Sequence, residues 1–118
     1  MTTLEQVRAH CLALPEVGER ISHGHPWFFI REKKGFVCLH DGFHGDNRRT
    51  LWCAAPPGQQ EGLIAGSPEH YFHPPYVGHR GWVGVYLDAD LAWDAVAGAI
   101  EEAYIHIAPA KLVALLAG

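Results

Sequence analysis

Cationic side chains stand in adjacent pairs on three predicted connections of this chain. Ammonium and guanidinium groups neutralise phosphate charge and release bound counterions, so three such pairs at a common rim would bind a nucleic acid or another anionic ligand. The residues that would contact phosphate are Lys33, Lys34, Arg48, Arg49, His79 and Arg80, with Lys111 as a peripheral contributor. In the alternative interpretation, these are ordinary solvated loop charges that keep strand edges from pairing with other chains.

The run from Pro74 to Asp88 combines turn-forming residues with aromatic ones. Its prolines fix φ and its glycines allow positive φ, so a rigid loop is expected to hold Arg80 and Trp82 where a strand begins. A second hypothesis is an aromatic pocket that binds a small molecule or a regulatory protein partner. Its residues would be His25, Trp27, Tyr76 and Trp82. The competing structural interpretation is that Arg80 lies on an aromatic face while Trp82 fills the core.

The composition limits the strength of any nucleic-acid binding. The chain has 118 residues, with 9 lysines and arginines, 13 aspartates and glutamates, and a formal net charge of −4 at pH 7. A domain that binds nucleic acid tightly at all times is usually basic, so binding to DNA should be weak and should fall steeply with salt. The charge is unevenly spread: bases outnumber acids between Arg31 and Arg49, whereas Lys111 is the only lysine or arginine after Gly81.

The length and the apolar share of 48% are typical of one globular domain with its own core, so residues 1–118 are treated as a single domain. No apolar run approaches the ~20 residues that cross a bilayer, and the N-terminus does not resemble a signal peptide. Three cysteines with apolar neighbours, Cys11, Cys38 and Cys53, are typical of buried, reduced thiols. We therefore expect a cytoplasmic protein that does not bind a membrane.

Histidine pairs suggest a metal site without completing one. The pairs are His23-x-His25, His40-x-x-x-His44 and His70-x-x-His73. None is joined by a cysteine or carboxylate at a characteristic distance, so neither a metal nor a cofactor is expected. The sequence also has no nucleophile elbow, no Gly-rich phosphate loop and no Cys-x-x-Cys, so we expect no enzymatic activity.

The hydrophobic pattern predicts an α+β fold, an antiparallel sheet with helices packed on one face. A capping box at Thr3 and Gln6 begins a helix that ends before Pro15, and residues 16–24 are expected to be a connector. Two strands then form a hairpin around a charged turn that ends in Gly35. The predicted strands cover residues 27–30, 36–39, 50–54 and 82–87.

Three further helices are predicted. A short one covers about residues 59–65, and a long one has an apolar stripe from Trp93 to Ile107 with Asp88 or Asp90 as its cap. Pro109 begins the last one. The predicted order is therefore helix, three strands, helix, strand and two helices.

Three separated motifs resemble the MmcQ/YjbR family, a bacterial family whose fold is described as CyaY-like, or frataxin-like. The motifs are Gly24-His25-Pro26-Trp27-Phe28 leading to Lys34-Gly35-Phe36, then Tyr76-Val77-Gly78-His79-Arg80-Gly81-Trp82-Val83, then Ala108-Pro109-Ala110-Lys111-Leu112. The resemblance extends over nearly the whole chain. It implies a DNA-binding label, because the hairpins of the family resemble paired wings, and fold analogy alone does not establish a function.

This sequence departs from the family pattern at two cationic positions. His79 stands where the family usually has lysine, and Ala110 stands where a second lysine often precedes Lys111. Both differences remove permanent positive charge from the surface that would bind DNA.

Overall fold

A computed structural model describes residues 4–22, 24–41, 49–87 and 90–117 of the chain. The elements in chain order are α1 (Leu4–Leu12), β1 (Val17–Ser22), β2 (His25–Ile30), β3 (Lys34–Asp41), β4 (Arg49–Cys53), α2 (Gln59–Gly66), β5 (Tyr71–Phe72), the 3-10 helix η2 (Gly78–Arg80), β6 (Val83–Tyr86), α3 (Trp93–Ile107) and α4 (Ala110–Ala117). In the described part of the chain, no helix is both long enough and apolar enough to cross a membrane.

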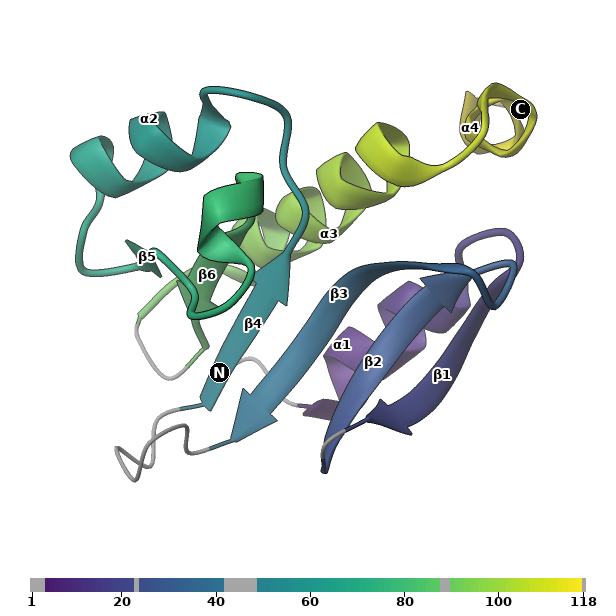
Figure 1. Cartoon of the computed structure of the whole chain (residues 1–118), viewed down its shortest axis with the longest axis horizontal. Helices are drawn as coiled ribbons and strands as arrows, with labels where there is room; N and C mark the ends of the chain where they lie inside the picture. The colour runs from purple at the N-terminus through teal and green to yellow at the C-terminus, as the bar shows by residue number, and fades with distance from the viewer. Residues whose placement is uncertain (1–3, 23, 42–48, 88–89, 118) are drawn as a thin grey trace.

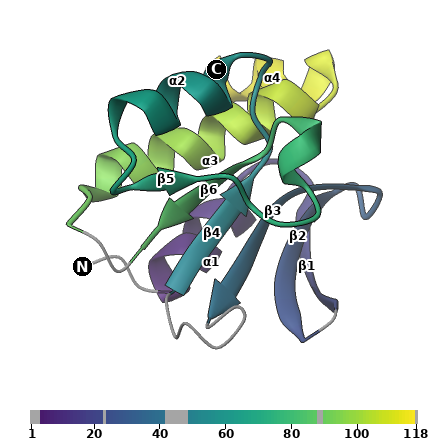
Figure 2. The same cartoon turned by 60° about the vertical axis from the view of Figure 1, so that its left-hand side comes forward.

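The strands form one antiparallel sheet in the order β1-β2-β3-β4-β6-β5. Helices α1 and α3 lie across the same face of this sheet, behind the strands in Figure 1. Strand β5 forms the edge of the sheet beside β6, and α2 lies next to β5 (Figures 1 and 2). The predicted α+β fold with an antiparallel sheet is confirmed.

The core lies between the sheet and helices α1 and α3. Val7 and Cys11 of α1 are fully buried, as are four residues of α3, namely Val96, Ile100, Ala103 and Tyr104. The Tyr104 ring meets the Phe36 ring of β3 edge to face, with centroids 5.7 Å apart. These residues recur at helical spacing along α3, so the apolar stripe read from the sequence is the face that covers the sheet.

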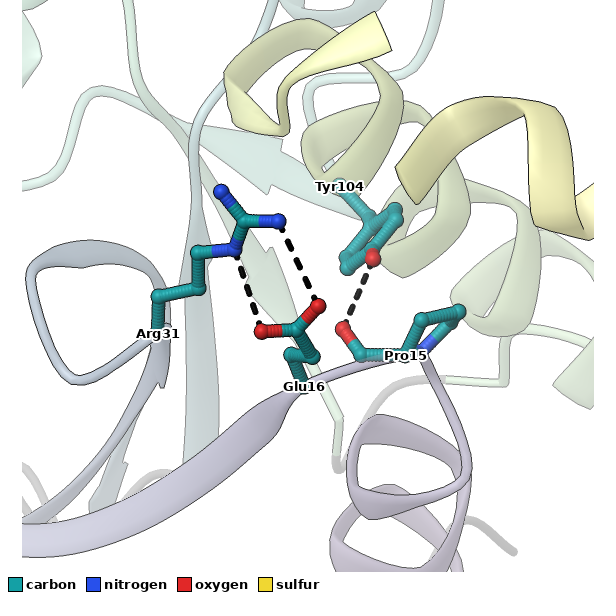
Figure 3. A network of polar contacts seen from close by, with 4 residues as sticks. All are labelled: Pro15, Glu16, Arg31 and Tyr104. Atoms are coloured by element: carbon teal, nitrogen blue, oxygen red, sulfur yellow. Dashed lines mark hydrogen bonds and ion pairs between the residues drawn. The ribbon is translucent and has the colours of Figure 1, made fainter. Parts of the chain in front are cut away.

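A small polar network fixes the corner where α1, β1, β2 and α3 meet (Figure 3). The buried Tyr104 hydroxyl donates to Pro15 O at 2.7 Å, and the Arg31 backbone N–H donates to Glu16 O at 2.9 Å. The Arg31 guanidinium also donates to both carboxylate oxygens of Glu16, at 3.1 and 3.4 Å. The turn after α1 is thereby tied both to the long helix and to the end of β2.

Two strands were not predicted from the sequence. The predicted connector 16–24 contains β1, whose six residues all pair with β2 although Glu19, Arg20 and Ile21 do not alternate as a buried strand does. Backbone pairing at the sheet edge, not burial, makes this segment a strand. The other is β5, two residues long, whose Phe72 ring lies directly over Gly84 of β6 in space that a Cβ would occupy.

The start of α3 also differs from the prediction. Its N-cap is Ala92, in extended conformation and without a side-chain hydrogen bond, so Asp90 does not cap the helix. Asp88 lies outside the described residues. Because α3 packs along most of its length against the sheet, tertiary burial stabilises it without a cap.

Replacing Tyr104 with Phe should lower the free energy of unfolding by about 1 kcal/mol, because the partly buried Pro15 O would lose its donor. Urea denaturation of the two proteins measures the difference. Tyr71→Phe is the control, since the structure gives the Tyr71 hydroxyl no hydrogen bond among the described residues, and its stability should change by less than about 0.5 kcal/mol. Equal stability of Tyr104→Phe and the unchanged protein would show that the hydrogen bond from Tyr104 to Pro15 O does not stabilise the fold.

Candidate functional site

The β2–β3 hairpin presents Lys33 and Lys34 on a tight and strained turn. The Lys33 backbone N–H donates to Ile30 O at 3.1 Å, which closes a β-turn around Arg31 and Glu32. Their φ angles are 55° and 59°, as in the primed turns of hairpins, where Asn and Gly are the usual residues. Two ordinary side chains at positive φ carry a conformational cost of about 1 kcal/mol or more each.

Alternation along β2 separates the core from a second aromatic layer. Phe28 and Ile30 are buried, whereas Trp27 and Phe29, on the opposite face of the strand, are only half-buried. Gly35 of β3 lies close to both rings: a Cβ there would stand 3.2 Å from Trp27 Cε3 and 3.3 Å from Phe29 Cε1. Gly35 is therefore not the end of the turn, as predicted, but the position in β3 that makes room for these rings.

Arg80 and Trp82 reach the same place from η2. Gly81 links them with a φ of 87°, and the buried Gln60 side chain of α2 donates to Gly78 O at 2.9 Å and to Trp82 O. The Trp82 ring lies 6.0 Å from the Trp27 ring, and the Arg80 guanidinium lies 5.6 Å from the Trp82 centroid. The predicted rigid loop thus packs against β2 through the contact between Trp82 and Trp27.

These residues enclose a cavity of about 520 Å³, which we call the hairpin cavity. It is lined by Ser22, Trp27, Phe29, Lys33, Lys34, Gly35, Arg80, Trp82 and Ile107. A neighbouring cavity of about 360 Å³ shares Lys33, Lys34 and Ile107 with it. The hairpin cavity therefore combines three cations from two separate connections with an aromatic floor.

No acid in the described part of the chain pairs with the cations of the hairpin cavity. Among the described residues, Lys33 and Lys34 form no ion pair or side-chain hydrogen bond, and Arg80 contacts only the Trp82 ring. Other arginines are paired: Arg8 with Glu19 at 2.9 Å and Arg31 with Glu16 at 3.1 Å. The positive charge of the cavity is therefore available to a ligand.

The remaining cations predicted to bind phosphate lie elsewhere. In the β3–β4 register, Arg49 lies opposite Asp41, at the end of β3 far from Lys34. The seven residues of strand between Lys34 and Asp41 span about 23 Å. His79 and Lys111 are exposed and do not line the hairpin cavity. Arg48 lies outside the described residues. The structure thus brings together Lys33, Lys34 and Arg80 and separates them from Arg49.

The residues predicted to form an aromatic pocket are also divided. Trp27 and Trp82 share the hairpin cavity, but Tyr76 does not line it. Tyr76 is 74% exposed, with a φ of 68°, and a hydrogen bond of 2.8 Å from Val77 N–H to Pro75 O closes a three-residue turn around it. His25 belongs to a second cavity, of about 140 Å³, with His40 and Arg49.

Three aromatic rings form a stack beside that second cavity. The His40 ring lies 3.7 Å from the Trp52 ring at an interplanar angle of 14°, and 3.9 Å from the His25 ring. His40 is buried, and burial, together with the nearby His25, lowers the pKa of its imidazole to about 4. His40 is thus held as a neutral ring.

The cysteines and histidines do not assemble a reactive or metal-binding cluster in the described part of the chain. Cys11, Cys38 and Cys53 are free and buried, and burial raises the pKa of all three thiols, that of Cys53 to about 12. Where the structure describes the chain, no three His, Cys, Asp or Glu side chains are placed to hold a metal ion. His23 and His44 lie outside the described residues.

Sequence analysis missed Phe29, Gly35, Ser22 and Ile107 of the hairpin cavity. The first two could have been found, because residues 27–30 alternate between the two faces of one strand and Phe29 must share the face of Trp27. Ser22 was missed with strand β1. Ile107 was assigned to the core stripe of α3, and only the tertiary structure places its end beside the hairpin.

Comparison with known proteins gave a family and a fold. A family model described as YjbR matches residues 12–106, in agreement with the resemblance of the sequence motifs. A search of curated proteins found no match. The crystal structure of Deinococcus radiodurans protein DR2400, with the family-model domain DUF419, superposes with a TM-score of 0.78 at 17% identity, over 94% of this chain and 82% of that one.

His40 should make the protein lose stability as the pH falls from 6.5 towards 4. In that range the unfolded chain binds a proton at His40 that the folded protein does not, so the free energy of unfolding falls with pH. His40→Phe removes this contribution, and its decline between pH 7 and pH 4 should be smaller by about 2 to 3 kcal/mol. Denaturant titrations at each pH measure it. The exposed His79→Phe serves as control, and a His40→Phe protein that declines like the control contradicts the prediction.

Proposed function

This chain belongs to the YjbR family, and we propose that it is a non-enzymatic binding module whose ligand is anionic and binds in the hairpin cavity. The observation that carries this proposal is the meeting of Lys33, Lys34 and Arg80, none of them paired with an acid among the described residues, in one cavity. Closely spaced cations of like charge repel one another, so an anion between them is strongly favoured.

The size of the cavity supports a small ligand or one segment of a larger one. A volume of about 520 Å³ lies within the range of roughly 300 to 1,000 Å³ that is usual for small-molecule sites. An apolar floor with a few convergent polar groups is also typical of such sites. Part of each residue set considered from the sequence therefore lines this cavity: Lys33, Lys34 and Arg80 of the phosphate-binding set, and Trp27 and Trp82 of the aromatic set.

Nucleic acid remains a candidate ligand, with fewer contacts than the seven cations of the sequence suggest. Arg49 is too far along β3 to act at the hairpin cavity. On duplex DNA, three phosphate contacts correspond to a slope of log affinity against log salt of about −3, whereas six would give about −5. The absence of an activated nucleophile among the described cysteines supports a binding role without catalysis.

Inorganic tripolyphosphate should bind to the unchanged protein in low salt, as measured by isothermal titration calorimetry without divalent cations. The double variant K33E/K34E and the single variant R80E should each weaken this binding at least about tenfold, because each replaces attraction with repulsion at the ligand. Lys111→Glu is the matched control for R80E: it changes the net charge by the same amount on α4, outside the cavity, and should lower the affinity less than about threefold.

Two outcomes would reject this site. One is the absence of any heat of binding in low salt. The other is an equal loss in R80E and in Lys111→Glu, which would mean that net charge alone decides the affinity. A salt titration with a fluorescent DNA duplex then gives the number of phosphate contacts. A slope of log affinity against log salt near −5 would support the wider binding surface that includes Arg49.

A further inference from the structure

We propose that the anion bound in the hairpin cavity carries a planar ring, as a nucleotide does, and that this ring stacks on Trp27 while Lys33, Lys34 and Arg80 bind its phosphates. This inference rests on the proposed function and adds the ligand class. The shared chemistry is a nucleobase joined to phosphate, whether in a free nucleotide or at a position along a single strand.

Trp27 is the aromatic surface that the cavity leaves open. Its ring is half-buried, and Gly35 places no side chain over it. The neighbouring rings of Phe29 and Trp82 lie 6.1 and 6.0 Å away by centroid, at 24° and 52°, distances typical of offset and tilted pairs. Part of the indole face therefore remains available to a ligand ring.

The other aromatic residues of the floor are already engaged. The Arg20 guanidinium from β1 lies 3.9 Å from the Phe29 centroid and covers that ring. Trp82 is only 3% exposed and lies beneath Arg80. A planar ligand entering the cavity thus meets Trp27 as its stacking partner, with Phe29 stacked at an offset beside the indole and Trp82 tilted against it.

The cations stand around this ring surface from two connections. Lys33 and Lys34 come from the hairpin turn, Arg80 comes from η2, and Trp27 and Ser22 lie on strands β2 and β1 of the floor. Ser22 adds a hydroxyl that can donate to or accept from a sugar or base. An aromatic platform combined with flanking positive charge is the arrangement that binds single-stranded nucleotides without requiring a base sequence.

The same geometry disfavours two related ligands. A sugar phosphate without a base makes no stacking contact with Trp27, so the indole face stays in contact with water. A base inside a duplex is already stacked between its neighbours, so its face is not available to Trp27 unless the base is unstacked. The preference expected is therefore for a nucleotide or a single strand over both.

ATP should bind at least about tenfold more tightly than tripolyphosphate under the same low-salt conditions, because stacking of one base adds roughly this factor or more. ATP should also quench tryptophan emission. In Trp27→Leu the advantage of ATP over tripolyphosphate should fall to less than about threefold. The ratio of the two affinities is measured in one protein, so a partial loss of folded protein does not imitate this result.

Trp93→Leu is the matched control. Trp93 is a half-buried tryptophan of α3 that contacts His10 and does not line the cavity, so this variant should keep the full preference for ATP. Fluorescent oligonucleotides of one sequence then distinguish the two sources of the ligand. Tighter binding of a single strand than of ATP assigns the site to a strand, and equal or weaker binding assigns it to a free nucleotide.

The outcomes separate this inference from the function on which it rests. If tripolyphosphate and ATP bind equally, the ring has no role, and anion binding stands alone. The same conclusion follows if Trp27→Leu keeps the preference for ATP, or if duplex DNA binds more tightly than the single strand. If neither compound binds, both proposals are rejected.

Discussion

The alternation of side chains along β2 sets the conditions for every other feature of the site. Helices α1 and α3 cover one face of the sheet, so Phe28 and Ile30 are buried against them, and Trp27 and Phe29 must pack on the side away from these helices. These rings pack against Gly35, Trp82 and one another, and only Ile107, at the end of α3, lines the same cavity from a described helix. A strand that is apolar on both faces but covered by helices on one of them leaves an aromatic surface, and the hairpin cavity forms there.

Local electrostatics and net charge point in opposite directions in this protein. The formal charge is −4, yet the cavity gathers three cations while Arg8 and Arg31 are consumed by ion pairs with glutamates. The exposed Arg31–Glu16 pair adds little stability, so its main effect here is to make Arg31 unavailable to a ligand. At physiological salt, charges further away than about 8 Å are largely screened, which makes the local set more important to a ligand than the total.

The sequence was sufficient for the fold class and for most elements, since the stripes of α1 and α3 and the apolar runs of β2, β3, β4 and β6 carry clear periodicity. It was not sufficient for β1 and β5, which depend on backbone pairing and on the contact of Phe72 with Gly84. For the site, the residue types were visible in advance, but their grouping was not. Whether Lys34 lies near Arg80 or near Arg49 depends on which ends of antiparallel strands meet, and that is a property of the register.

The turn at Arg31 and Glu32 limits which substitutions can stabilise this protein without affecting its candidate site. A loop whose backbone favours Asn-Gly carries two charged residues at positive φ, and one of them, Arg31, is also bound to Glu16. Thermostability could be gained there with a single dipeptide exchange, without disturbing any core residue. Such an exchange would also loosen the anchor that links this hairpin to the corner below α3. The φ and ψ angles of Arg31 and Glu32 therefore affect both the thermal stability of the protein and the position of the two lysines that would bind a ligand.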